Sequence, residues 1–227
     1  MSSSDPFTPL IAAVEQADSA ALLFQATREL AGALAIQSRD PMQGSPPAAA
    51  LSCLVQILGF NNPGAAVAAV EGLIASGPAA VTPLLEGLDG QNYGARAWAV
   101  RALAGIGDVR GLELLEQALS EDIGPSVRRA AAIGLGTLRL GDLALPERPS
   151  IEERALAALE RGRHDGEWVV RYAVATAMEK LALRLQELEE GQRRAVASLC
   201  SLADHSCEEV PVVRLRAKLA LSRLTSP

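Results

Sequence analysis

Arginine and aromatic side chains recur in the middle of the chain, at related positions of successive amphipathic segments. Five of them form a candidate ligand-binding set: Tyr93, Trp98, Arg101, Arg129 and Tyr172. Arginine forks bind carboxylates through paired hydrogen bonds, and aromatic rings pack against flat apolar groups. These residue types therefore predict the binding of an amphipathic ligand that carries carboxylates. They do not single out a catalytic residue.

Residues for conventional catalysis or metal binding are sparse. The chain has two histidines, His164 and His205, and Cys200 and Cys207 lie near the second of them. This loose cluster lacks the paired spacing of a zinc site, so we expect no bound metal. The sequence contains neither a phosphate-binding P-loop motif nor a GxGxxG motif. No self-contained active site is visible.

Repeated helices must position these side chains. Six helical segments align on one frame, with partner segments expected at residues 47–58, 79–88, 112–119, 151–160 and 192–203. The anchor positions of the frame, separated by 43, 30, 32, 43 and 43 residues, are Leu23, Ala66, Arg96, Arg128, Arg171 and Arg214. One helix pair cannot bury its apolar stripe alone, so neighbouring pairs must stack. We predict an all-α, HEAT-like repeat solenoid, a right-handed superhelix of antiparallel helix pairs.

Composition limits the class of protein. The 227 residues are 49% hydrophobic but only 3% aromatic, which favours helices over strands. A net charge of −6 argues against nucleic-acid and anionic-membrane binding. An odd number of cysteines, with no apparent signal peptide or membrane span, predicts a reduced, cytoplasmic protein. We expect one domain over residues 1–227, with a disordered tail at residues 1–9.

Each second helix of a pair should have a core stripe and an opposite, inner face that lines a concave surface. For the segment from Tyr93, the predicted core stripe is Ala95, Ala99, Ala102, Leu103 and Ile106. Two rows follow on the inner face at 100° per residue. The first row is Val67, Ala97, Arg129, Tyr172 and Leu215, and the second is Glu71, Arg101, Ile133, Thr176 and Leu219.

Several of these side chains have a structural interpretation beside the functional one. The arginines at the anchor positions often bind acidic or carbonyl groups of the adjacent repeat in solenoids, and we favour that role over ligand contact. Trp98 has small residues at most equivalent positions, so it either fills a gap between helices or contacts a ligand. Trp168, next to a helix start, is expected to be a packing anchor.

The run N-Y-G-A-R-A-W-A at residues 92–99 carries a family resemblance, together with residues 61–77, 126–136 and 167–173. Over roughly residues 20–185 the chain resembles the E/F-type bilin lyases. It is most similar to the beta-subunit type of phycocyanin alpha-subunit phycocyanobilin lyase. The resemblance implies a heterodimer with a related HEAT-repeat alpha subunit. Such a pair attaches a linear tetrapyrrole, phycocyanobilin, through a thioether to a cysteine of an apo-phycobiliprotein.

The resemblance implies no cofactor apart from the bilin, which is the bound substrate. Some members of the family also isomerise the bilin and carry an Asn-His-Cys motif, from which Asp204-His205-Ser206-Cys207 departs. We therefore expect attachment without isomerisation. An alternative is a non-catalytic HEAT-repeat chaperone or adaptor that acts on phycobiliproteins, since such a protein would also lack an active site.

Overall fold

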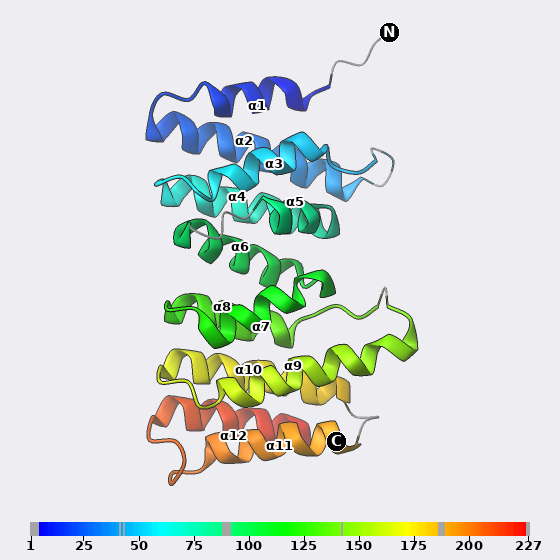
Figure 1. The fold of residues 1–227 in the computed structure, drawn as a ribbon, viewed down its shortest axis with the longest axis vertical. Helices are drawn as coiled ribbons and strands as arrows, with labels where there is room; N and C mark the ends of the chain where they lie inside the picture. The colour runs from blue at the N-terminus through cyan, green and yellow to red at the C-terminus, as the bar shows by residue number, and fades with distance from the viewer. Residues whose placement is uncertain are drawn as a thin grey trace. The chain divides into compact units, whose positions relative to one another are not determined.

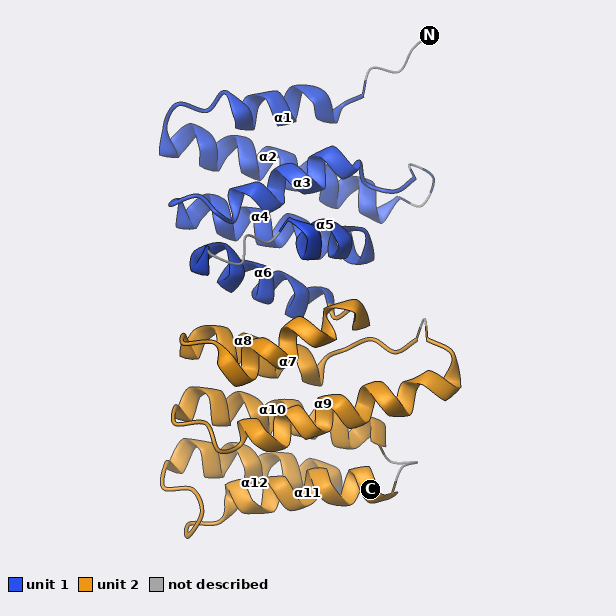
Figure 2. Cartoon of the chain, viewed as in Figure 1, with its two compact units in different colours: residues 1–106 blue, residues 107–227 orange. Residues whose placement is uncertain are grey.

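The computed structural model describes residues 5–40, 42, 44–87, 92–141, 143–185 and 189–225. Within these ranges the secondary structure is helical, apart from one isolated bridge between Asp108 and Arg139. The chain forms two compact units, residues 1–106 and 107–227 (Figure 2). The expectation of a single domain over the whole chain stays a prediction.

Unit 1 contains three second helices that pack in series, α2 on α4 and α4 on α6 (Figure 1). Its helices are α1 (Phe7–Glu15), α2 (Ala20–Arg39), α3 (Ala48–Ile57), α4 (Pro63–Ser76), η2 (Gly77–Ala80), α5 (Val81–Glu86) and α6 (Tyr93–Ile106). The partner helices predicted at residues 47–58 and 79–88 correspond to α3 and to η2 with α5. Residue 88 lies outside the described residues.

Unit 2 repeats the arrangement, with α8 packed on α10 and α10 on α12. Its helices are η3 (Val109–Gly111), α7 (Leu112–Glu121), α8 (Pro125–Gly136), η4 (Leu145–Glu147), α9 (Arg148–Gly162), α10 (Trp168–Arg184), α11 (Glu189–Ala203) and α12 (Pro211–Thr225). The three partner helices predicted in this region are confirmed as α7, α9 and α11. They begin up to three residues earlier than the apolar pattern indicates.

The N-terminus corrects one expectation. Residues 7–9, which the sequence placed in a disordered tail, begin α1, and Phe7 is buried at 5% exposure. Asp5 starts the helix, because its carboxylate accepts hydrogen bonds from the Phe7 amide at 3.1 Å and the Thr8 hydroxyl at 2.9 Å. This helix is the partner of α2 that the repeat pattern did not reveal.

Asparagine caps fix the starts of α4 and α6. The Asn62 side chain accepts a hydrogen bond from the Ala65 amide at 3.1 Å, and Asn92 accepts one from Ala95 at 3.0 Å. Each cap also donates to a carbonyl oxygen outside its own helix, Asn62 to Ala20 at 2.9 Å and Asn92 to Gly59 at 3.3 Å. The same residue therefore starts a helix and ties it to an earlier part of the chain.

Small residues allow the second helices to approach closely. A Cβ atom added to Gly136 in α8 would lie 2.6 Å from both the Cα and the Cβ of Ala177 in α10. The predicted core stripe of α6 is also confirmed, because all five of its residues are buried. Each unit therefore has a core of Ala, Leu and Val that leaves the opposite side of its second helices available.

The segment Pro63–Glu86 is long and apolar enough to cross a membrane by length and composition. However, 56% of its apolar window is buried inside the structure. The α-helix also ends at Ser76, because Gly77 has a positive φ of 60°. Packing against α2 and α6 accounts for its hydrophobicity.

Candidate ligand-binding face

The second helices expose one face in each unit, which we call the second-helix face. In unit 1 it consists of Phe24, Arg28, Val67, Glu71, Ala97, Trp98 and Arg101. In unit 2 it consists of Arg129, Ile133, Tyr172, Thr176, Leu215 and Leu219. All of these side chains are exposed or half-buried, so the two rows derived from the 3.6-residue period are confirmed as accessible surface.

Trp98 and Arg101 form a pair on α6. The Arg101 guanidinium carbon lies 5.7 Å from the centroid of the Trp98 ring, a cation–π geometry. Trp98 is half-buried, whereas Arg101 is exposed and has no carboxylate partner among the residues that the structure describes. The pair therefore presents a partly desolvated aromatic face beside a guanidinium whose hydrogen-bond donors are available.

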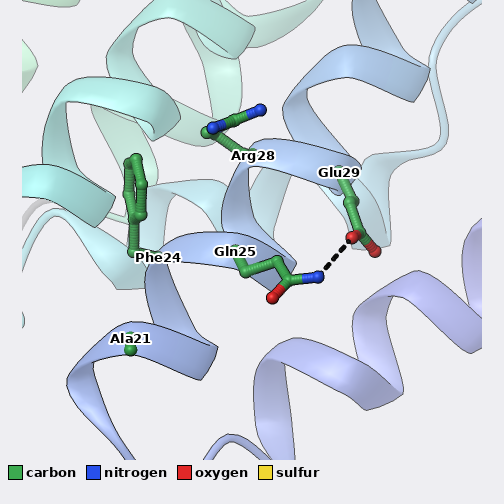
Figure 3. Close-up of a pocket in the computed structure, with 5 residues that line it drawn as sticks. All are labelled: Ala21, Phe24, Gln25, Arg28 and Glu29. Carbon is green, nitrogen blue, oxygen red and sulfur yellow. Dashed lines mark hydrogen bonds between the residues drawn. The ribbon is translucent and has the colours of Figure 1, made fainter.

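A second pair of the same kind lies on α2. Arg28 stacks on Phe24 at 5.7 Å, next to an open pocket of about 380 Å³ that also involves Ala21, Gln25 and Glu29. The Gln25 amide donates a hydrogen bond to the Glu29 carboxylate at 3.1 Å (Figure 3). Phe24 and Arg28 hold the same positions of the helical frame as Ala97 and Arg101. The sequence-based set missed them, although the anchor at Leu23 already gave their register.

Unit 2 presents the other two candidate side chains on adjacent helices. Arg129 of α8 is exposed, and it forms no ion pair within the described part of the chain. Tyr172 of α10 is half-buried, and its carbonyl oxygen accepts the Thr176 hydroxyl at 3.0 Å. The structure thus groups Tyr93, Trp98 and Arg101 in unit 1, and Arg129 and Tyr172 in unit 2.

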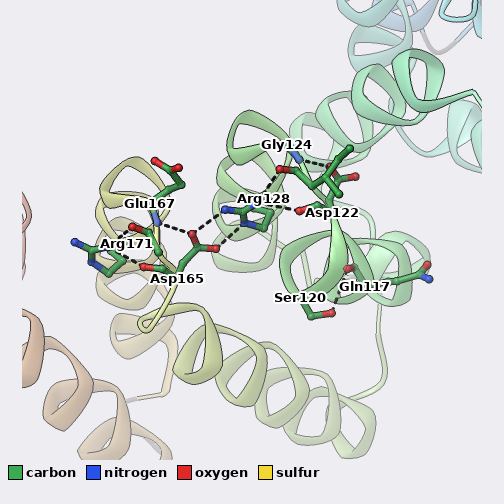
Figure 4. A network of polar contacts seen from close by, with 10 residues as sticks. Gln117, Ser120, Asp122, Gly124, Arg128, Asp165, Glu167 and Arg171 are labelled. Carbon is green, nitrogen blue, oxygen red and sulfur yellow. Dashed lines mark hydrogen bonds and ion pairs between the residues drawn. The ribbon is translucent and has the colours of Figure 1, made fainter.

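The anchor arginines of unit 2 have structural partners, as expected. Arg128 donates to both oxygens of the Asp165 carboxylate, at 2.6 and 3.0 Å, and to the carbonyl oxygens of Asp122 and Ile123 (Figure 4). Arg171 does the same one repeat later, with Glu208 at 2.6 and 2.9 Å. Each arginine therefore joins the loop before its own helix to the loop of the next repeat.

Carboxylates of this network have lowered pKa values. Burial alone would raise the pKa of Asp165, but hydrogen bonds from Arg128 and Glu167 and the charges of Arg128 and Arg171 outweigh it. The hydrogen bond from Arg171 is the largest influence on Glu208 and holds its pKa below the usual value, against the effect of burial. Both carboxylates are thus held in the charged form that the arginines require.

The aromatic residues at the starts of α6 and α10 are exposed. Tyr93 and Trp168 are the first residues of α6 and α10, and each is 45% exposed. The interpretation of Trp168 as a packing anchor is therefore wrong. Proline occupies the equivalent position in α4, α8 and α12, which shows that the helix start needs no aromatic ring.

The segment from Asp204 to Cys207 forms a turn after α11. Asp204 accepts hydrogen bonds from the Ser206 amide at 2.8 Å and the Ser206 hydroxyl at 2.9 Å, while His205 and Cys207 are exposed. In the described residues no three His, Cys, Asp or Glu side chains are grouped as metal ligands. This turn therefore provides no metal site among the described residues.

Comparison with known proteins places the chain in a family. A model for HEAT repeats matches residues 81–179, in agreement with the predicted fold class. The "Phycocyanobilin lyase subunit beta" of Thermosynechococcus vestitus is 46% identical over 218 residues, which cover 94% of this chain and 93% of the relative. The chain belongs to this family of phycocyanobilin lyase beta subunits.

Other proteins of this kind are also similar to the chain. The "Phycocyanin alpha phycocyanobilin lyase CpcF" of Synechocystis sp. is 49% identical over 181 residues, covering 80% of this chain and 79% of the relative. A chain in the solved complex of CpcE and CpcF of phycocyanin lyase from Nostoc sp. superposes with a TM-score of 0.68 at 36% identity. That match covers 77% of this chain and 99% of the other. Family membership thus rests on both sequence and fold.

Two carboxylates that organise unit 2 escaped the sequence reasoning. Asp165 and Glu208 each precede an anchor arginine by six residues and receive the arginine of the preceding repeat. Asp122 holds the equivalent position before Arg128, so an acidic residue recurs at intervals of 43. This periodicity was a usable signal, because a repeated acid beside a repeated arginine indicates ion pairs between repeats.

Proposed function

We propose that the chain is one subunit of a heterodimeric bilin lyase. The complex attaches phycocyanobilin through a thioether to a cysteine of a phycobiliprotein alpha subunit. The observation that carries this proposal is the near full-length similarity to phycocyanobilin lyase beta subunits. The partner subunit is a related HEAT-repeat protein, in line with the solved complex of CpcE and CpcF. The same similarity supports a cytoplasmic location.

The second-helix face supplies groups that suit a bilin, the bound substrate in this proposal. A linear tetrapyrrole has flat, apolar pyrrole rings and two propionate groups. Trp98 and Arg101 already stand as an aromatic and guanidinium pair, and Arg129 has no competing carboxylate among the described residues. Tyr93 and Tyr172 add rings of intermediate polarity. We assign Tyr93, Trp98 and Arg101 of unit 1, and separately Arg129 and Tyr172 of unit 2, to contacts with bilin through ring packing and charge-assisted hydrogen bonds.

Attachment then depends on positioning. The nucleophile is the thiol of the acceptor protein, and its sulfur forms a bond to the ethylidene carbon of the bilin. The thiol proton is transferred to the bilin, so this addition has no leaving group. Holding the two reactants in reacting geometry contributes several kcal/mol without a side chain of the lyase taking part in bond formation. We therefore assign no catalytic residue to this chain.

The turn from Asp204 to Cys207 supports attachment without isomerisation. It departs from the Asn-His-Cys motif, because Asp204 stands at the first position and Ser206 separates His205 from Cys207. The Ser206 hydroxyl donates a hydrogen bond to one carboxylate oxygen of Asp204, at 2.9 Å, within the turn. We propose that only the ethylidene double bond is consumed, by the addition of the thiol, and that the other double bonds of the chromophore keep their positions.

Co-expression tests the proposal. The chain, the partner subunit, an apo-phycobiliprotein alpha subunit and a source of phycocyanobilin are expressed together, and in sets that each omit one component. Denaturing electrophoresis with zinc-induced fluorescence detects covalent pigment. We expect fluorescence on the acceptor only in the complete set. Equal fluorescence without this chain would refute the lyase assignment, and better acceptor solubility with no added pigment would favour the chaperone alternative.

A further inference from the structure

Exposed apolar side chains recur in unit 2 where each second helix begins. Ile123 precedes α8 and is 82% exposed, Trp168 begins α10 at 45%, and Val212 in the first turn of α12 is 41% exposed. The loops before these three helices lie at the same end of the unit (Figure 2). We call Ile123, Trp168 and Val212 the apolar loop edge. Repeated exposure of large apolar groups is typical of protein-interaction surfaces.

The arginine network holds the apolar loop edge in place. Arg128 binds the carbonyl oxygen of Ile123 at 3.1 Å and the carboxylate of Asp165 (Figure 4). That carboxylate in turn accepts the amide of Glu167 at 2.8 Å, one residue before Trp168. The loops that carry Ile123 and Trp168 are therefore joined by hydrogen bonds and an ion pair. A surface fixed before binding loses little conformational entropy when a partner docks.

Acidic side chains accompany the edge. Glu167 and Glu209 are exposed, and neither forms an ion pair with another described residue. Arg128 and Arg171, which lie nearby, have their guanidinium groups bound to carboxylates and carbonyl oxygens within the unit. The edge thus combines apolar anchors with exposed carboxylates that make no ion pair within the described residues. Its complement is a protein surface that offers apolar side chains surrounded by lysine or arginine.

The edge continues into the second-helix face. Trp168 lies four residues before Tyr172 on α10, and residues at this spacing are neighbours on a helix surface. Ile123 likewise lies in the loop that leads into the helix of Arg129. A protein seated on the edge is therefore next to the proposed bilin-binding residues of unit 2. The acceptor protein has to reach that place, because its cysteine must meet the bilin.

We propose that the apolar loop edge of unit 2 is the docking surface for the acceptor phycobiliprotein, through an apolar patch with a basic rim. This inference rests on the proposed function. It assigns Ile123 and Trp168 as the main apolar anchors, Glu167 and Glu209 as the charged rim, and the arginine network as their rigid support.

Acceptor binding by the assembled lyase tests this directly, with apo-phycobiliprotein as the probe and no bilin present. The variants are Trp168→Ala, Ile123→Ser and their combination, in complex with the partner subunit. The matched control is Leu145→Ser, because Leu145 is an apolar residue of unit 2 that is 73% exposed and lies outside the edge. We expect the double variant to bind the acceptor about tenfold more weakly or worse, because two apolar anchors are lost. The control should bind like the parent.

Attachment kinetics separate the possible outcomes. The double variant should show a higher KM for the acceptor, with kcat and bilin binding within twofold of the parent. Unchanged acceptor affinity in the double variant would overturn the inference. Size-exclusion chromatography of the double variant with the partner subunit gives a second check. If the two subunits elute separately while the parental pair elutes together, the edge belongs to subunit pairing and the inference is overturned. If the parental complex binds the acceptor at this edge but attaches no pigment, the docking surface stands and the proposed function fails.

Discussion

Replacing Arg128 with alanine tests the ion-pair network of unit 2 most sharply. The side chain makes two hydrogen bonds to the Asp165 carboxylate, at 2.6 and 3.0 Å, and two to carbonyl oxygens, at 2.9 and 3.1 Å. The side chains of Arg128 and Asp165 are only 15% and 9% exposed, so water screens the pair weakly. The substitution leaves a largely buried carboxylate without its main partner.

The magnitude follows from these contacts. Hydrogen bonds to charged groups contribute about 1.5–3 kcal/mol, and removal of one partner of a buried ion pair costs about 3–5 kcal/mol. Asp165 retains the Glu167 amide at 2.8 Å, which offsets part of the loss. We therefore expect Arg128→Ala to lower the free energy of unfolding by about 3 kcal/mol. For a unit of this size the melting temperature should fall by roughly 10 °C.

The adjacent residue provides the control. Arg129 is exposed and forms no ion pair with any described residue, so Arg129→Ala should change stability by less than about 0.5 kcal/mol. Urea unfolding and thermal melting, followed by far-UV circular dichroism, measure both variants. A double variant, Arg128→Ala with Asp165→Asn, should recover part of the loss because no unpaired charge remains. Equal stability of the two single variants would refute the structural role of Arg128.

Two further predictions concern the same unit. The folded-state pKa values of Asp165 and Glu208 are lowered, so their stabilising effect is complete above the unfolded values of about 4 and is lost as pH falls through the lower folded values. Urea titrations at a series of pH values should therefore show that the free energy of unfolding falls below about pH 4, and that it falls less steeply in Glu208→Gln than in the parent. The same pH dependence in both proteins would contradict the assignment. Gly136→Ala should cost about 1–3 kcal/mol, because its Cβ would collide with Ala177, whereas Gly141→Ala has nothing within 4 Å and should melt like the parent. Equal melting temperatures would show that α8 and α10 are less closely packed than described.

Helical periodicity predicted most of the fold because each repeat presents the same apolar stripe. The 3.6-residue period placed Ala99 and Leu103 in the core and Arg101 at the surface, and the structure agrees. It failed for α1, whose start depends on one Asp5 cap rather than on a repeated pattern.

The site was only partly predictable. Exposure of Arg101 and Arg129 follows from local periodicity, but their lack of ionic partners among the described residues depends on tertiary neighbours. Trp168 shows the limit most clearly. A tryptophan at a helix start was expected to pack, yet Trp168 is exposed, and Arg171 holds the preceding loop through the Asp165 carbonyl oxygen. The arginine network joins residues 37 positions apart and is not visible in any single repeat.

Chromophore transfer by arginine variants tests the central claim most directly. The lyase complex is assembled with the parental chain, Arg101→Ala or Arg129→Ala, and covalent phycocyanobilin on the acceptor is followed over time. Both variants should melt like the parent, because no core contact is lost, and each should transfer bilin about tenfold more slowly or worse at limiting bilin. If both variants transfer chromophore at the parental rate, the second-helix face does not bind the bilin and the account is wrong.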